Sequence, residues 1–214
     1  MNKLCIIHTT PTTIISLKPL VNEILGGIAI CNFLDDSILP EINGTGYITD
    51  GVRMRVENML RSAASVAPDA ILFACSTIGE LTVLAEPLTC IPVCRIDEPM
   101  CAEAVEKGVT IAVAATLDST LAPTCGLIEA IASAQGKAIT LIKRRIDGAN
   151  AALHDGRGEV YDEMVSAALK ELKAQADIVV LAQASMARAL AKIETDKELY
   201  LTSPASGLEA LRCL

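Results

Sequence analysis

Cys75-Ser76-Thr77 combines a thiol with two hydroxyls directly after a run of apolar residues. The apolar run Ile71-Leu72-Phe73-Ala74 predicts a buried strand, and the apolar-periodic residues after Thr77 predict a helix. We therefore expect Cys75 at a strand-to-helix junction, where backbone N–H groups are free and the helix end is partly positive. That field favours the thiolate, which is the reactive form of cysteine. A buried structural cysteine is the alternative, but the two neighbouring hydroxyls favour a functional one.

Other polar side chains follow other predicted strand ends. His8 ends the first strand, where it would either polarise a substrate or serve as a structural hydrogen-bonding group. Hydroxyls, backbone amides and one loop tyrosine complete the set that we expect to bind substrate: Thr10, Thr12, Tyr47, Ser76, Thr77, Thr116, Thr120, Ala184 and Ser185. Each hydroxyl alone is equally well an ordinary helix cap. Their recurrence near several strand ends favours donors for a negatively charged ligand.

The chain repeats itself at a spacing of 108 residues. The run Asp69–Thr77 aligns with Asp177–Ser185, so that Gln183 corresponds to Cys75. The same shift sets His8–Thr12 on Thr116–Thr120. We interpret this as two similar halves that arose by duplication.

Short apolar runs alternate with helical patterns along the whole chain, which indicates parallel sheets with helical crossovers. The strand-like runs are Leu4–His8, Ile28–Phe33, Ala70–Ala74, Cys90–Val93, Val109–Ala115, Ala138–Ile142, Ile178–Ala182 and Leu199–Leu201. We predict an α/β protein with two pseudo-symmetric, flavodoxin-like halves. Each half has a mainly parallel four-stranded sheet flanked by helices, with the active site expected between the halves. Residues 1–96 and 203–214 would form the first half, and residues 97–202 the second.

Composition narrows the function classes. The net charge of −8 disfavours nucleic acid and anionic membranes as partners. No apolar run is long enough to span a bilayer, and no signal peptide is recognisable, so we expect a cytoplasmic protein with eight free cysteines. Cys90 and Cys94 lack the further ligands that a metal site would need. We interpret His154 as a surface group and the basic run Lys143-Arg144-Arg145 as part of a solvated loop. No nucleotide-binding glycine motif is present.

With these motifs in place, the chain resembles the aspartate/glutamate/hydantoin racemase superfamily, which also contains arylmalonate decarboxylase and maleate isomerase. The segments that carry the resemblance are Ala74–Thr77, Arg95–Met100, Ala115–Thr120 and Leu181–Met186. The resemblance implies a site between two halves, no pyridoxal phosphate or metal, and one catalytic cysteine on each half. It also relates Tyr47 to a position that contacts substrate in the decarboxylases.

The sequence departs from this family pattern at the second cysteine. The first falls on Cys75, but the second falls on Gln183, and an amide is not a base. We therefore expect a cofactor-independent enzyme that transfers a proton at the α-carbon of a small carboxylate. Cys75 would act as acid and base, and Gln183 would occupy the second catalytic position. We expect the protein to form a homodimer or a higher homo-oligomer. A single-cysteine decarboxylase of a malonate-like acid, a hydrolase with a cysteine nucleophile and a non-catalytic small-acid binding protein are the alternatives.

Overall fold

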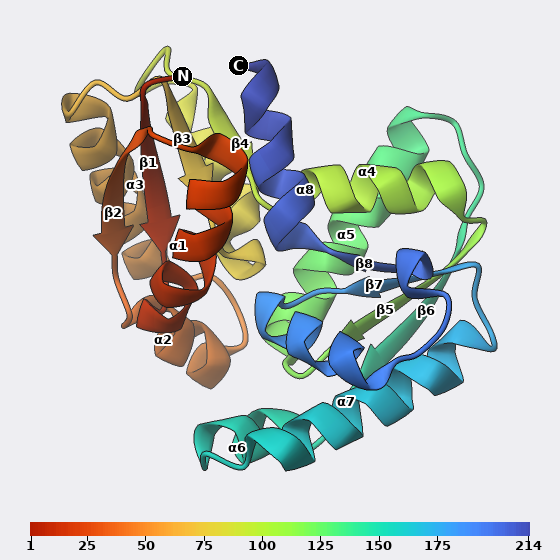
Figure 1. The fold of residues 1–214 in the computed structure, drawn as a ribbon. Helices are drawn as coiled ribbons and strands as arrows, with labels where there is room; N and C mark the ends of the chain where they lie inside the picture. The colour runs from red at the N-terminus through yellow and green to blue at the C-terminus, as the bar shows by residue number, and fades with distance from the viewer. The chain divides into compact units, whose positions relative to one another are not determined.

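The computed structural model describes residues 1–214, which divide into two compact units. Unit 1 comprises Met1–Asp97 and Pro204–Leu214, and unit 2 comprises Glu98–Ser203. Each unit contains one four-stranded sheet whose strands are all parallel, with helices on both faces (Figure 1). The predicted α/β class, with two four-stranded parallel sheets flanked by helices, is confirmed. None of the helices combines the length and the apolar character that crossing a membrane would require.

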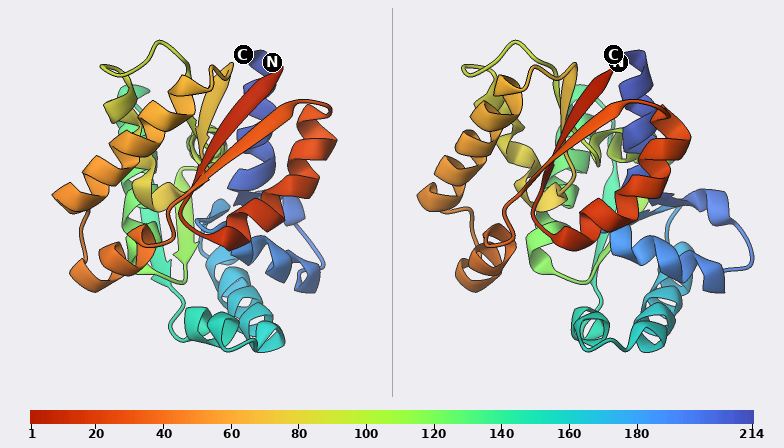
Figure 2. Two further views of the ribbon diagram at one scale, coloured as in Figure 1. Left: turned by 90° about the vertical axis from the view of Figure 1, so that its left-hand side faces the viewer. Right: turned by 60° about the vertical axis from the view of Figure 1, so that its left-hand side comes forward.

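In unit 1 the strand order is β2-β1-β3-β4. Alternate residues of β1 point to opposite faces of the sheet, as the pleat requires. Cys5 and Ile7 join a buried cluster with α3, whereas Leu4 and Ile6 join a cluster with α1 and α8. Figure 2 shows α3 on one side of this sheet and α1 and α8 on the other. The elements of unit 1 are β1 (Lys3–His8), α1 (Pro11–Leu25), β2 (Ala29–Leu34), α2 (Ile38–Thr45), α3 (Asp50–Ser65), β3 (Ala70–Phe73), the 3₁₀ helix η1 (Ser76–Ala85), β4 (Val93–Arg95), α8 (Ser203–Ala210) and the 3₁₀ turn η4 (Leu211–Cys213).

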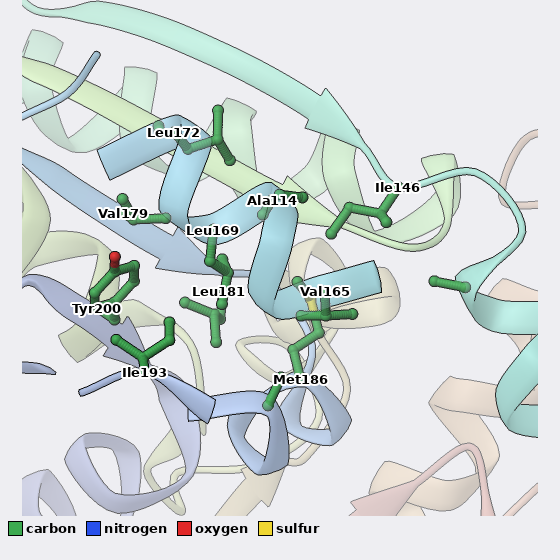
Figure 3. Close-up of a cluster of buried hydrophobic side chains, with 14 of the residues drawn as sticks. Ala114, Ile146, Val165, Leu169, Leu172, Val179, Leu181, Met186, Ile193 and Tyr200 are labelled. Carbon is green, nitrogen blue, oxygen red and sulfur yellow. The ribbon is translucent and has the colours of Figure 1, made fainter. Parts of the chain in front are cut away.

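Unit 2 repeats this plan with the order β6-β5-β7-β8. Its α7 covers the face of the sheet that carries Val179 and Leu181, and Figure 3 shows Val165, Leu169 and Leu172 of that helix packed over it. Helices α4 and α5 cover the opposite face. The elements of unit 2 are α4 (Glu98–Lys107), β5 (Thr110–Ala115), α5 (Asp118–Ala134), β6 (Thr140–Arg145), α6 (Ala149–His154), α7 (Gly158–Lys173), β7 (Ile178–Leu181), η2 (Ala184–Lys192), η3 (Lys197–Leu199) and β8 (Tyr200–Thr202).

The strand registers correct the alignment of the two halves. Ile7 lies opposite Phe73 in unit 1, and Ala114 lies opposite Leu181 in unit 2. Equivalent residues in the third strands of the two units are therefore 108 positions apart in the sequence, but equivalent residues in the first strands are 107 positions apart. Two carboxylates support this alignment: Asp69 accepts the N–H groups of Asn2 and Lys3, and Asp177 accepts those of Val109 and Thr110. The prediction that one shift of 108 serves both strands is wrong, because unit 2 is one residue longer between its first and third strands.

Three local predictions also need correction. The fourth strand of unit 1 begins at Val93 instead of Cys90, because pairing with β3 starts only at Ile71 opposite Val93. The basic run Lys143–Arg145 is the end of edge strand β6 and not a loop. Its side chains pair with surface carboxylates, a common way to protect an exposed sheet edge. The helix after Cys75 is confirmed but is a 3₁₀ helix.

Candidate functional site

Cys75 lies two residues beyond β3, at the first position before η1. Its backbone is extended, with φ −135° and ψ 116°, and its thiol makes no capping hydrogen bond to the helix. The residue is half-buried, while Ser76 and Thr77 behind it are buried. The thiol is thus held at the carboxyl end of a central parallel strand, which is the edge where open α/β sheets bind ligands.

Arg95 holds η1 against the end of the neighbouring strand β4. Its guanidinium donates two hydrogen bonds to Asp97, each 2.9 Å long, and the Asp97 side chain is only 1% exposed. Gly79 of η1 lies directly against this guanidinium, because a Cβ there would be 2.6 Å from the Arg95 Cζ atom. The absence of a side chain at Gly79 lets the helix that follows Cys75 pack on a fixed ion pair.

His8 is buried and bonded through both ring nitrogens. Its Nδ1 lies 2.8 Å from the Thr13 hydroxyl and its Nε2 lies 2.9 Å from the Asn32 side-chain oxygen. Burial lowers the pKa of His8, opposed by the hydrogen bond to Asn32, so the ring is held in its neutral form. A neutral imidazole donates from one nitrogen and accepts at the other, and here both are engaged. Contact between His8 and a substrate would require one of these bonds to break.

Unit 2 holds Gln183 where unit 1 holds Cys75. Gln183 precedes η2 in an extended conformation, with φ −127° and ψ 134°. Thr116, at the end of the neighbouring strand β5, donates both its backbone N–H (2.6 Å) and its hydroxyl (2.8 Å) to the Gln183 side-chain oxygen. The hydroxyl proton of Thr116 is therefore used to position Gln183, and direct binding of substrate by Thr116 stays a prediction.

Thr9 is the unit 1 counterpart of Thr116, and sequence reasoning missed it. The offset of 107 for the first strand relates Thr9 to Thr116, and the offset of 108 relates Cys75 to Gln183. Thr9 is fully buried, and its hydroxyl has no hydrogen-bond partner. An unpaired buried hydroxyl is costly and uncommon, so it marks a place where a ligand could complete the bonding. The register-corrected repeat is the sequence signal that would have found it.

The other residues that the sequence predicted to bind substrate differ in how far they are buried. Thr120 is buried near the start of α5, and the Ser185 hydroxyl is bonded to Tyr161 at 3.0 Å. Burial raises the pKa of Tyr161, so its phenol stays protonated. Thr10 and Ala184 are partly exposed beside a helix start, whereas Thr12 is exposed on the first turn of α1.

Polar groups of the loop after β2 form hydrogen bonds and ion pairs within unit 1. Asp35 accepts hydrogen bonds from Ser37 and pairs with Arg55 of α3 at 3.2 Å. Tyr47 extends into solvent with 65% of its surface exposed. Unit 1 therefore does not bring the Tyr47 side chain into a buried environment. His154 is exposed, in agreement with its interpretation as a surface group.

The eight cysteines are unpaired and occupy different environments. Burial raises the pKa of Cys5 to about 11, with a smaller contribution from Cys31, and burial raises the pKa of Cys125 to about 11. These two thiols are therefore protonated at neutral pH. No three His, Cys, Asp or Glu side chains are grouped as metal ligands.

Comparison with known proteins agrees with this architecture. The family model for Asp/Glu/Hydantoin racemase matches residues 35–206. The fold resembles that of an aspartate racemase from Picrophilus torridus, with a TM-score of 0.76 at 12% identity over 99% of this chain and 93% of the other. An allantoin racemase from Klebsiella pneumoniae gives 0.71 at 17% identity over 100% and 87% of the two chains. A glutamate racemase from Francisella tularensis, solved with D-glutamate, gives 0.71 at 14% identity over 99% and 80%. A search of curated proteins found no match.

The family match covers most of the chain, so the chain belongs to the Asp/Glu/Hydantoin racemase family. The resemblance predicted from its motifs is confirmed. Family membership supports an enzyme with a racemase-like function, in the class of isomerases.

Proposed function

We propose that the protein is a cofactor-independent enzyme that transfers a proton at the α-carbon of a small carboxylate, with Cys75 as acid and base. The observation that carries this proposal is the half-buried thiol at the carboxyl end of β3, before a helix whose first N–H groups it does not cap. A thiolate there would take the α-proton, and its thiol would return it. Amino acids, hydroxy acids and dicarboxylates are the candidate substrate classes.

The negative charge that develops on the substrate needs donors that are already in place. Removal of an α-proton leaves an enediolate, which preorganised N–H and O–H groups stabilise. The buried Thr9 hydroxyl has no other partner, and the backbone of Ser76 and Thr77 begins η1. These groups support an oxyanion site on unit 1 beside the reactive thiol.

Gln183 makes the chemistry one-sided in this proposal. Inverting a carbon takes a base on one face and an acid on the other, and an amide provides neither near neutral pH. The same one-sided arrangement suits decarboxylation of a malonate-like acid, in which Cys75 would protonate the carbanion left by CO₂. Decarboxylation is thus the second candidate function.

The test is a substrate panel in deuterated water. Amino acids, hydroxy acids and malonates are incubated with the protein, and loss of the α-proton signal and release of CO₂ are followed by NMR. Deuterium incorporation supports the proposal, and CO₂ release supports the decarboxylase. Release of an acid or amine without exchange would indicate a cysteine-nucleophile hydrolase, and binding without reaction a non-catalytic protein; both would overturn the proposal.

A further inference from the structure

We infer that Gln183 binds a carboxylate of the ligand through its side-chain N–H groups, and that Thr116 positions it for this role. The inference rests on the proposed function and extends it, because it assigns a binding role to the position that corresponds to Cys75 in unit 2. The contacts that carry it lie entirely within unit 2.

The orientation of the Gln183 amide is fixed by chemistry. A backbone N–H only donates, so the Gln183 atom that lies 2.6 Å from the Thr116 nitrogen has to be the oxygen. The Thr116 hydroxyl reaches the same oxygen at 2.8 Å. Two donors on one acceptor hold the amide plane and leave its nitrogen on the opposite side.

The nitrogen side of the amide is unused within the protein. The hydrogen bonds of the Gln183 side chain are both accepted by its oxygen, none is donated by its nitrogen, and the residue is partly exposed. That nitrogen carries two N–H donors, and a carboxylate oxygen is the complementary acceptor. An amide also stays neutral at any physiological pH, so it would donate without exchanging a proton with the substrate.

The cationic side chains of η2 are already paired. Arg188 binds Asp162 at 2.7 Å, and Lys192 binds Glu159 at 2.9 Å. The carboxylates of α7 thus neutralise both cations, and they leave the Gln183 amide as an unpaired donor at the start of this helix. A neutral donor held in one orientation favours a carboxylate of defined geometry over anions in general.

Malonate is the probe for this inference, with the side-chain amide signals of Gln183 as the readout. Gln183→Leu identifies those signals by their loss from the ¹⁵N–¹H spectrum of the full chain. Titration of malonate should shift them, with chloride at equal ionic strength as the control. Malonate affinity should fall about 10- to 100-fold in Gln183→Leu, as expected for a hydrogen bond to a charged group. In Gln183→Glu, charge repulsion should remove binding.

Thr116 supplies the matched test of positioning. Thr116→Val removes the hydroxyl and should weaken malonate binding about fivefold, while Thr116→Ser should restore it. Amide signals that do not move at any malonate concentration would overturn the inference, as would full affinity in Gln183→Leu. Catalysis is measured separately, by the exchange of α-protons in the substrate panel. If malonate shifts the Gln183 signals but no panel compound exchanges its α-proton, the proposed function fails and this inference stands.

Discussion

Replacing Gly79 with alanine tests how η1, and with it Cys75, is held. The new Cβ would lie 2.6 Å from three atoms of the Arg95 guanidinium, Cζ, Nε and Nη2. An ordinary contact needs about 3.5 Å, so either the guanidinium or the helix has to move by about 1 Å. The guanidinium is held by two hydrogen bonds to a buried carboxylate, Asp97, and cannot simply swing aside.

The cost of this change follows from the two ways to relieve the contact. Breaking a buried ion pair costs about 3–5 kcal/mol, and overpacking a well-filled site costs about 1–3 kcal/mol. The response that costs less free energy, overpacking with the ion pair kept, should dominate. We therefore expect Gly79→Ala to lower the free energy of unfolding by about 2–3 kcal/mol. For a chain of this length that corresponds to a fall in Tm of roughly 4–12 °C. A displaced η1 should also slow α-proton exchange, because misplacement by about 1 Å can cost about 10²-fold.

Differential scanning calorimetry and urea unfolding measure the effect, with Gly126→Ala as the matched control. Gly126 lies within α5, and a Cβ there would meet nothing within 4 Å. That variant should gain roughly 0.5–1 kcal/mol from helix propensity. In the Arg95→Met/Asp97→Asn background, which lacks the guanidinium, Gly79→Ala should cost less than about 1 kcal/mol. Equal stability of wild type and Gly79→Ala, or an unchanged cost in that background, would refute this reasoning.

Three further predictions concern single groups. Cys75 should react with iodoacetamide faster than Cys5, whose pKa of about 11 keeps it protonated; equal labelling of both at neutral pH, mapped by mass spectrometry, would count against a catalytic Cys75. Burial lowers the pKa of His8, so below pH about 6.5 the unfolded chain takes up a proton on this ring more readily than the folded chain does. The free energy of unfolding should therefore fall as pH drops through about 6.5, and it should level off below the pKa of His8 in the folded state. Urea unfolding should show this loss in wild type and in His154→Gln, which alters an exposed ring, but not in His8→Gln. Gln183→Cys should add some racemisation to one-sided exchange, measured by chiral chromatography from both enantiomers; racemisation by the wild type would show that another group is the second acid.

The central strands of both sheets were predictable because they are mainly apolar runs. β1, β3, β5 and β7 are buried on both faces, and such strands consist almost wholly of aliphatic residues. β4 was harder to place, since Ile91 and Val93 carry the apolar signal while the paired segment continues to Arg95. The charge of Arg95 is tolerated there because Asp97, two residues further along the chain, neutralises it.

The candidate site was only partly predictable for a similar reason. The position of Cys75 before a helix follows from residues on either side of it, so a local pattern sufficed. The pairing of Thr116 with Gln183 joins residues 67 positions apart and depends on strand register. A one-residue difference between the units concealed the role of Thr9, because the single shift of 108 set His8 opposite Thr116 and residue spacing alone does not show where an extra residue is inserted.

The exchange of an α-proton by Cys75→Ser tests the central claim most directly. Each enantiomer of a panel substrate is incubated in deuterated water with wild type, with Cys75→Ser and with Cys90→Ser, which alters an exposed thiol. Wild type and Cys90→Ser should incorporate deuterium with retained configuration, whereas Cys75→Ser should be slower by about 10²–10⁴-fold, the usual contribution of an acid–base group. Exchange at the wild-type rate in Cys75→Ser would contradict the assignment of Cys75 as the acid–base group.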